Sequence, residues 1–287
     1  MNAAAVTASL FLDSRAALAE SPVWDIDAQE LVWTDIPVGA LHRTSADGTR
    51  DRATRVGPPL ACVQRRRGGG LIVAGTDDVS LVDDDGGNPS VVAKVAFRHA
   101  AMRFNEGKCD PFGNFVVGAL DPDGNADSDV YRITPSGDIS LLWGGFGTTN
   151  GMEWNDDGTE IYVTDTDVKT VFRASYGPDG VTGELVPFSV GGSHDGLVRD
   201  ERGEFWGAIY GEGRVVHLDV DGREIGEIRV PADNVTGVAI GGPGMSTLFI
   251  TSARENATEQ ELEKLPYSGG IFTVDLDRRG RETFLFG

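Results

Sequence analysis

Short apolar runs, each bounded by polar or turn-forming residues, recur along the chain at a nearly constant interval. The clearest of them lie at 30–35, 70–75, 114–118, 160–165, 204–208 and 247–251. Equivalent apolar positions in successive runs are 40 to 46 residues apart. Runs of this length, rich in β-branched and aromatic residues, are typical of β-strands. Six repeats of about 44 residues therefore account for nearly the whole chain.

A second apolar run follows each of these runs, and an Asp-Gly or Ser-Gly turn often comes next. The second runs lie at 39–44, 79–82, 129–133, 170–174, 214–218 and 269–274. Strands joined by such turns are typical of hairpins. Six four-stranded units without a long helix predict an all-β fold, a six-bladed β-propeller that forms one domain over residues 1–287. A pair of β-sandwiches is the alternative, but it does not explain a repeat that crosses the middle of the chain without a linker.

Two features of the chain ends complete the predicted ring. We expect residues 7–12 to pair into the last blade, beside 283–286 or the strand before it, because closure removes exposed sheet edges. A short surface helix is predicted at 258–265 within the same blade. Thr258 and Glu261 form a capping-box pattern there, and Pro266 ends the helix.

Four polar segments occupy the same position in four different repeats. Glu20, Asn105, Asn150 and Asp195 each precede the central apolar residue of the next run by 10 or 11 residues. If these runs form the innermost strands, the polar side chains ahead of them meet at one mouth of the central channel. Asn-Gly and Asp-Gly are also ordinary turn dipeptides. The shared offset favours a common site over independent turns.

The residue types in these segments point to a metal ion. Glu20, Asn150 and Asp195 make an all-oxygen set with a formal charge of −2. Hard divalent cations prefer such oxygen ligands. Three protein ligands leave coordination positions for water and substrate, which allows activation of a carbonyl group or generation of hydroxide.

The composition of the chain limits the classes of molecule that it can bind. The chain of 287 residues carries a net charge of −20, which argues against nucleic acid and otherwise serves solubility. Its two cysteines, Cys62 and Cys109, are expected to be reduced and partly buried. No apolar run is long enough to cross a membrane, and the run at 10–12 is too short for a signal peptide, so we expect a cytoplasmic location.

Six motifs give the chain a family resemblance. "GEGPxWD" resembles 19–25 with Ala19 and Ser21 in place of glycines, "RxNDGKxDPxG" resembles 103–113 with Glu106 in place of Asp, and "NGxxW" and "YxxDT" match 150–154 and 162–166. "PDGxxxDxxGxxW" resembles 194–206 with His194 in place of Pro, and "LYxTSAR" resembles 248–254 with Phe249 in place of Tyr. The chain therefore resembles the family of senescence marker protein (regucalcin), gluconolactonases and luciferin-regenerating enzyme.

This resemblance implies a six-bladed propeller that binds one divalent metal ion and hydrolyses sugar lactones such as gluconolactone or a pentonolactone. Ca²⁺ is the first choice of metal, with Mg²⁺, Mn²⁺, Zn²⁺ and Fe²⁺ as alternatives. By carry-over, the metal ligands are Glu20, Asn150 and Asp195, the substrate-binding residues are Arg103, Asn105 and Asp121, and the catalytic residue is Asp195. Asp195 would move protons to and from the attacking water.

Several further expectations accompany this assignment. His194 either tunes Asp195 or fills space, Lys108 pairs with a carboxylate, and Cys109 belongs to the core. The Asp-rich loop at 121–130 forms part of a lid. Alternative functions are a related hydrolase of other esters or organophosphates and a non-enzymatic calcium-binding or docking propeller. The small-molecule lactone would be the main partner of a monomer or weak homodimer.

Overall fold

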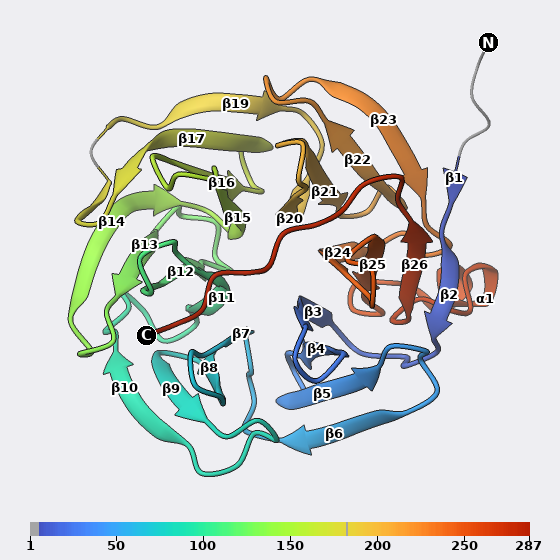
Figure 1. The fold of residues 1–287 in the computed structure, drawn as a ribbon, viewed down its shortest axis with the longest axis horizontal. Helices are drawn as coiled ribbons and strands as arrows, with labels where there is room; N and C mark the ends of the chain where they lie inside the picture. Colours follow the sequence, from blue (N-terminus) through green and yellow to red (C-terminus); the bar gives the residue numbers. More distant parts are fainter. Residues whose placement is uncertain (1–5, 182) are drawn as a thin grey trace.

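Six antiparallel sheets surround a central channel in the computed structural model, which describes residues 6–181 and 183–287 (Figure 1). Each sheet is one blade, and the blades follow one another around the ring in chain order. The predicted all-β, six-bladed propeller is confirmed. Among the described residues, no helix is long and apolar enough to cross a membrane.

The first three blades each contain four consecutive strands. Blade 1 consists of β3 (Ala19–Asp25), β4 (Glu30–Asp35), β5 (Ala40–Ser45) and β6 (Asp51–Arg55). Blade 2 consists of β7 (Cys62–Arg65), β8 (Leu71–Ala74), β9 (Asp78–Val82) and β10 (Ser90–Lys94). Blade 3 consists of β11 (Arg103–Cys109), β12 (Phe115–Leu120), β13 (Ser128–Ile133) and β14 (Ile139–Phe146).

Blades 4 and 5 each contain one additional strand, and blade 6 takes its fourth strand from the N-terminal segment. Blade 4 contains β15 (Thr149–Trp154), β16 (Glu160–Asp165), β17 (Thr170–Gly177) and β19 (Val186–Val190), and the short β18 (Gly180–Val181) also pairs with β17. Blade 5 contains β20 (His194–Arg199), β21 (Phe205–Ile209), β22 (Arg214–Leu218) and β23 (Glu224–Arg229), with β1 (Val6–Thr7) added in parallel. Blade 6 contains β24 (Val235–Gly241), β25 (Thr247–Ser252), β26 (Ile271–Asp275) and β2 (Ser9–Leu12).

The apolar runs that reveal the repeat are the second strands of the blades, so the prediction that they are innermost is wrong. The innermost strands are β3, β7, β11, β15, β20 and β24 (Figure 1). Second strands such as β4 and β21 are buried at every position, because neighbouring blades cover both of their faces. This complete burial makes their apolar pattern stronger than that of the polar strands that line the channel.

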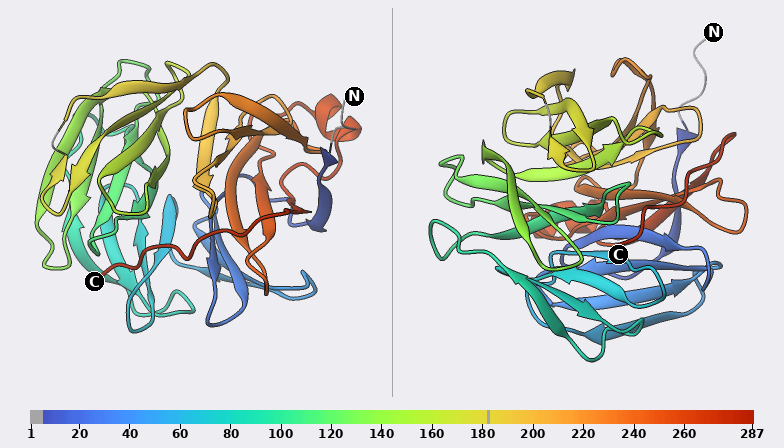
Figure 2. Two further views of the ribbon diagram at one scale, coloured as in Figure 1. Left: turned by 45° about the horizontal axis from the view of Figure 1, so that its top comes forward. Right: turned by 60° about the vertical axis from the view of Figure 1, so that its left-hand side comes forward.

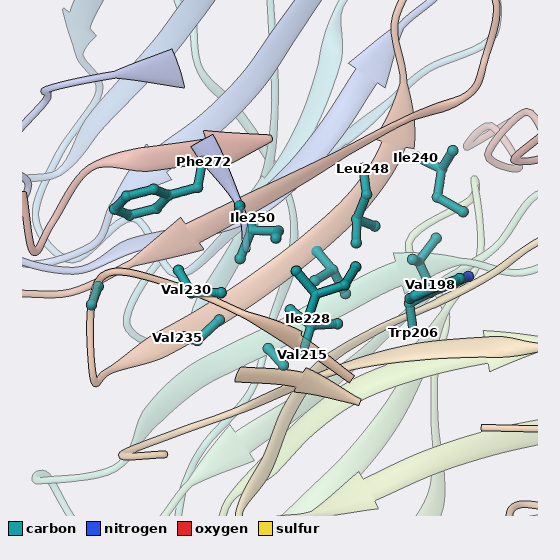
Figure 3. Close-up of a cluster of buried hydrophobic side chains, with 14 residues drawn as sticks. Val198, Trp206, Val215, Ile228, Val230, Val235, Ile240, Leu248, Ile250 and Phe272 are labelled. Carbon is teal, nitrogen blue, oxygen red and sulfur yellow. The ribbon is translucent and has the colours of Figure 1, made fainter. Parts of the chain in front are cut away.

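Apolar side chains between neighbouring blades form the core. Between blades 5 and 6, Val198, Trp206 and Val215 pack with Leu248, Ile250 and Phe272 (Figure 3). A second cluster joins blades 2 and 3 and contains Cys62 and Cys109, which are free thiols and are fully buried, more so than the sequence suggested. Burial of such apolar surface contributes about 25 cal/mol per Å². The core thus lies in the walls between blades and leaves the axis for polar groups.

The N-terminal segment supplies the outermost strand of the last blade. β2 pairs in antiparallel fashion with β26, which is the strand before 283–286 (Figure 1). Residues 276–287 form no part of that sheet. They instead run across one end of the channel (Figures 1 and 2), where the Gly280 amide bonds Met245 of blade 6 and the Phe286 amide bonds Arg65 of blade 2.

The predicted helix is present between β25 and β26. Helix α1 spans Glu259–Lys264, Thr258 is its N-cap, and the reciprocal capping box with Glu261 is formed. None of its residues is buried. It lies at the outside of blade 6, away from the centre of the ring (Figure 1).

Candidate functional site

Each of the four polar segments contains a β-bulge within an innermost strand. In β3 the pairing with β4 shifts register between Glu20 and Val23. A bulge adds a residue on one strand and turns a side chain out of the regular alternation. Equivalent shifts lie between Phe104 and Gly107 in β11, between Thr149 and Met152 in β15, and between His194 and Leu197 in β20. The Asn-Gly and Asp-Gly dipeptides are therefore parts of bulged strands, and their interpretation as simple turns is wrong.

Glycines at the bulges let the innermost strands approach one another. A side chain on Gly151 would place its Cβ 2.4 Å from the Leu197 amide nitrogen, and one on Gly196 would place its Cβ 2.7 Å from the Gly237 Cα. Real Cβ atoms do not tolerate such contacts, so these positions require glycine. The close approach brings the residues just before them, Asn150 and Asp195, to the axis of the ring.

Five of the predicted site residues come together. Arg103 Nη1 donates to Asn105 Oδ1 at 2.8 Å, and Asn105 Nδ2 donates to Asn150 Oδ1 at 2.8 Å. The carboxyl groups of Glu20 and Asp195 lie within hydrogen-bonding distance of each other. Glu20, Asn150 and Asp195 are all buried. The structure thus collects one guanidinium, two amides and two carboxyls from blades 1, 3, 4 and 5.

A third carboxyl group, Glu106, joins this cluster and was not among the predicted site residues. Burial raises the pKa of Glu106 to about 7. Burial, and then the charge of Glu106, raise the pKa of Glu20 to about 8. Burial and the charges of Glu20 and Glu106 raise the pKa of Asp195 well above its usual range. The one sequence signal for Glu106 is that it replaces the Asp of the family motif.

The charges of this cluster are only partly matched. Arg103 is the cation that acts on both Glu20 and Asp195, and burial lowers the pKa of this arginine. Asp195 Oδ1 is buried and has no hydrogen-bond partner among the described residues. The carboxyls of Glu20 and Asp195 and the amide oxygen of Asn150 are buried oxygen donors of the kind that hard divalent cations prefer. A metal ion therefore fits the residues present.

Lys108 lies on β11, two residues after Glu106, and contacts a different carboxylate. Its Nζ donates to Glu153 Oε2 at 2.8 Å and to the Leu197 carbonyl oxygen at 3.1 Å. The side chains of both charged residues are at most 14% exposed. The expectation that Lys108 pairs with a carboxylate is confirmed.

Ser21 explains one departure from the family motif. It has a positive φ of 50°, a conformation that favours glycine. Its hydroxyl accepts from the Val63 amide at 3.0 Å and lies 3.3 Å from the Val63 carbonyl oxygen. These contacts tie the bulge of blade 1 to the innermost strand of blade 2 and offset the backbone strain.

Asp121 does not join the cluster through its contacts. Its carboxylate accepts from the backbone amides of Asp123 at 2.9 Å and Asn125 at 2.8 Å, and it lies 3.2 Å from His99 Nε2. The side chain is fully buried. Asp121 thus organises the loop that follows β12. This loop starts beside the cluster, because Leu120 pairs with Arg103.

The surroundings of His194 do not favour a role in proton transfer. Burial, with the charge of Arg214, lowers the pKa of His194 to about 4. The ring packs against Gly207, where an added Cβ would lie 3.0 Å from its Nδ1. The space-filling alternative is the one that these contacts favour.

Two other groups of side chains have the composition of a metal site. One is His99, Asp121 and Asp123, and the other is Asp200, Glu204 and His217. The second group already contains a cation, because Arg278 pairs with Glu204 and lies 3.6 Å from Asp200. In the first group, backbone amides occupy the Asp121 oxygens. The channel cluster is the stronger metal candidate.

The fold and this cluster define a six-bladed propeller with an acidic, oxygen-rich site in its channel. A family model described as the SMP-30/Gluconolactonase/LRE-like region matches residues 18–254, and the chain belongs to that family. The resemblance noted in the motifs is confirmed.

Two lactonases and one solved structure are similar to this chain over nearly the full length of both chains. A 6-deoxy-6-sulfogluconolactonase of Pseudomonas putida is 32% identical over 94% of both chains. A pentonolactonase of Haloferax volcanii is 30% identical over 97% of this chain and 98% of its own. Among solved structures, a calcium-binding protein, regucalcin, from Agrobacterium tumefaciens is 25% identical with a TM-score of 0.91, covering 99% of this chain and 100% of its own.

Proposed function

We propose that this protein is a divalent-metal-dependent hydrolase that opens a sugar lactone to the corresponding aldonic acid. The observation that carries the proposal is the cluster of two buried carboxyls, Glu20 and Asp195, and the partly buried Glu106, with one nearby guanidinium. Named sugar lactonases among the relatives support the substrate class. The calcium-binding regucalcin supports Ca²⁺ as the first metal to test.

Glu20, Asn150 and Asp195 would hold the cation, each through an oxygen atom. When bound, a divalent cation supplies Lewis-acid polarisation of the lactone carbonyl. Arg103 would donate to the oxygens of the substrate through its other guanidinium N–H groups, and Asn105, whose Nδ2 already donates to Asn150 and Thr149, would accept from a substrate hydroxyl through its Oδ1. These residues orient the lactone with respect to the attacking water.

Asp195 would serve as the general base and then the general acid. It accepts a proton from the water as the new bond to the carbonyl carbon forms, and it returns this proton to the ring oxygen as the lactone C–O bond breaks. Its buried Oδ1 has no partner among the described residues, which leaves that oxygen available. Asp121 would act on the substrate indirectly, by shaping the loop beside Arg103.

The test is lactone hydrolysis by metal-stripped protein, followed with a pH indicator. Ca²⁺, Mg²⁺, Mn²⁺, Zn²⁺ and Fe²⁺ are added in turn, with gluconolactone and several pentonolactones as substrates and a correction for spontaneous opening. We expect metal-restored turnover of at least one lactone. A protein that binds a cation tightly but opens no lactone would contradict the proposal.

A second candidate function is a non-enzymatic calcium-binding propeller, which the description of the Agrobacterium protein favours. The same assay with a phosphotriester and simple esters tests whether the protein is instead a related hydrolase of those substrates. Tight Ca²⁺ binding without turnover of any substrate would favour the binding role.

A further inference from the structure

A continuous line of hydrogen bonds connects three blades across the site. Arg103 Nη1 donates to Asn105 Oδ1 at 2.8 Å, and Asn105 Nδ2 donates to Asn150 Oδ1 at 2.8 Å. Asn150 Nδ2 then donates to Thr166 Oγ1 at 2.7 Å, and the Thr166 hydroxyl donates to the His194 carbonyl oxygen at 2.5 Å. The line thus starts in blade 3, passes through blade 4 and ends in blade 5.

The two ends of this line determine the direction of every bond in it. The Arg103 guanidinium can only donate, so Asn105 must turn its oxygen toward it. The His194 carbonyl can only accept, so the proton of the Thr166 hydroxyl points to it. Thr166 therefore offers a lone pair to Asn150, and the group that faces Thr166 must be the Asn150 NH₂.

A flipped Asn150 amide would lose both of its neighbours. Its oxygen would face the Thr166 oxygen, whose proton is already committed to His194, and its NH₂ would face the NH₂ of Asn105. The Asn105 amide cannot rotate in compensation, because its Nδ2 also donates to the Thr149 carbonyl at 3.0 Å. Asn150 Oδ1 is thus held on the side of Asn105. It keeps one lone pair free, since a carbonyl oxygen has two.

We propose that Thr166 is a positioning residue that presets Asn150 Oδ1 for the metal ion. The inference rests on the proposed function, in which Asn150 is a ligand. Thr166 also bonds the carbonyl of the residue directly before Asp195, so one hydroxyl ties two ligand-bearing strands together. It is the last residue of the "YxxDT" motif, to which the sequence assigns no role. Residues that orient metal ligands in this way commonly change metal affinity by 10- to 100-fold.

Thr164, two residues before Thr166, provides a matched control. It is fully buried in β16, and its hydroxyl has no partner among the described residues. Thr166→Val and Thr164→Val therefore make the same chemical change two positions apart. Only the first removes a hydroxyl that contacts the site. Thr166→Ser keeps the hydroxyl and removes only the methyl group.

The experiment is calorimetric titration of metal-stripped protein with Ca²⁺, and with Mn²⁺ as a second probe. We expect Thr166→Val to bind about 10- to 100-fold more weakly than the wild type. Thr166→Ser should stay within about threefold of the wild type, and Thr164→Val should be unchanged. Melting midpoints in EDTA show that the variants are folded, and Thr166→Ala serves as the test if Thr166→Val is not.

Each other outcome overturns a defined statement. Wild-type affinity in Thr166→Val, or an equal loss in Thr164→Val, would overturn the role of Thr166 and leave the proposed function intact. A wild-type protein that binds neither cation would overturn both. A wild-type protein that opens no lactone, but whose Ca²⁺ affinity depends on the Thr166 hydroxyl, would overturn the lactonase assignment alone.

Discussion

Buried carboxylates occur in two regions of this propeller, and only one of the regions neutralises them. Between blades 1 and 2, Asp25 and Glu30 both pair with Arg43, and Arg65 lies 3.2 Å from Asp25. Arg52 adds a further bond to Glu30 at 2.9 Å. In the channel, Arg103 is the cation that acts on Glu20 and Asp195, whereas Glu106 is influenced by Lys108, which already pairs with Glu153.

This difference separates a structural ion-pair network from a binding site. Burial of a charge is unfavourable unless a partner compensates it. The first network supplies its compensation from within the chain, so its carboxylates are paired without an external ligand. In the channel cluster, burial outweighs the compensation from Arg103 and Lys108 and raises the pKa values of the carboxyl groups. A divalent cation could therefore bind to the carboxyls of the channel cluster. In the network, arginine side chains already occupy the carboxylates.

The largest expected effect that tests this contrast is the loss of turnover in Asp195→Asn. The substitution removes a metal ligand and the proton carrier together, so kcat should fall by at least about 10³-fold. The melting midpoint of the metal-free protein should be unchanged or higher, because a neutral amide replaces a poorly compensated carboxyl. Steady-state kinetics and thermal unfolding measure the two quantities.

Asp277→Asn is the control for this substitution, since that carboxylate is exposed and lies far along the chain from the cluster. It should leave kcat unchanged. Turnover within tenfold of the wild type in Asp195→Asn would mean that another group carries the proton.

The second-largest expected effect is a loss of stability when the ion-pair network around Arg43 is broken. Arg43→Met should lower the free energy of unfolding by about 3 kcal/mol, because it leaves Asp25 buried without its principal partner. Urea unfolding of the metal-free protein measures this change, and kcat of the folded protein should be unaffected. Arg223→Met is the control, since its side chain is 74% exposed and should contribute little. Equal stability of the two variants would show that the network is not needed for folding.

The smallest effect is a pH dependence of stability that originates in the channel. Glu20 and Glu106 have pKa values of about 8 and about 7 in the folded protein, against an ordinary value of 4.5. Between pH 4.5 and about 8 the unfolded chain therefore releases protons that the native site retains. The contribution of these groups thus makes the metal-free protein less stable as pH rises through this window.

Glu106→Gln removes one of these groups and isolates the effect. At pH 4 the variant and the wild type should unfold at the same temperature, because Glu106 is protonated in both of its states. At pH 8 the metal-free variant should be the more stable of the two. Saturating Ca²⁺ should reverse this order, since the bound cation favours the carboxylate. A pH-independent difference would show that Glu106 acts by packing alone.

The sequence by itself determined the number of blades and the positions that face one another in the ring. The apolar runs of the second strands repeat because every blade must be covered on both faces, and this requirement is visible along a single chain. The common offset of Glu20, Asn105, Asn150 and Asp195 follows from the same repeat. Local capping chemistry likewise predicted α1, because Thr258 and Glu261 interact within one turn.

Only the tertiary structure decided which strand lines the channel and which side chains contact one another in the site. Asn105 and Asn150 are 45 residues apart, and their bond exists because two bulged strands from different blades meet at the axis. The contributions of Glu106 and Thr166, and the separation of Asp121 from the cluster, depend on such contacts between blades. Residue pattern encodes the period of each blade and the burial of its faces. The direction of a single amide or carboxyl at the axis is set by neighbours that the chain reaches only after it has folded.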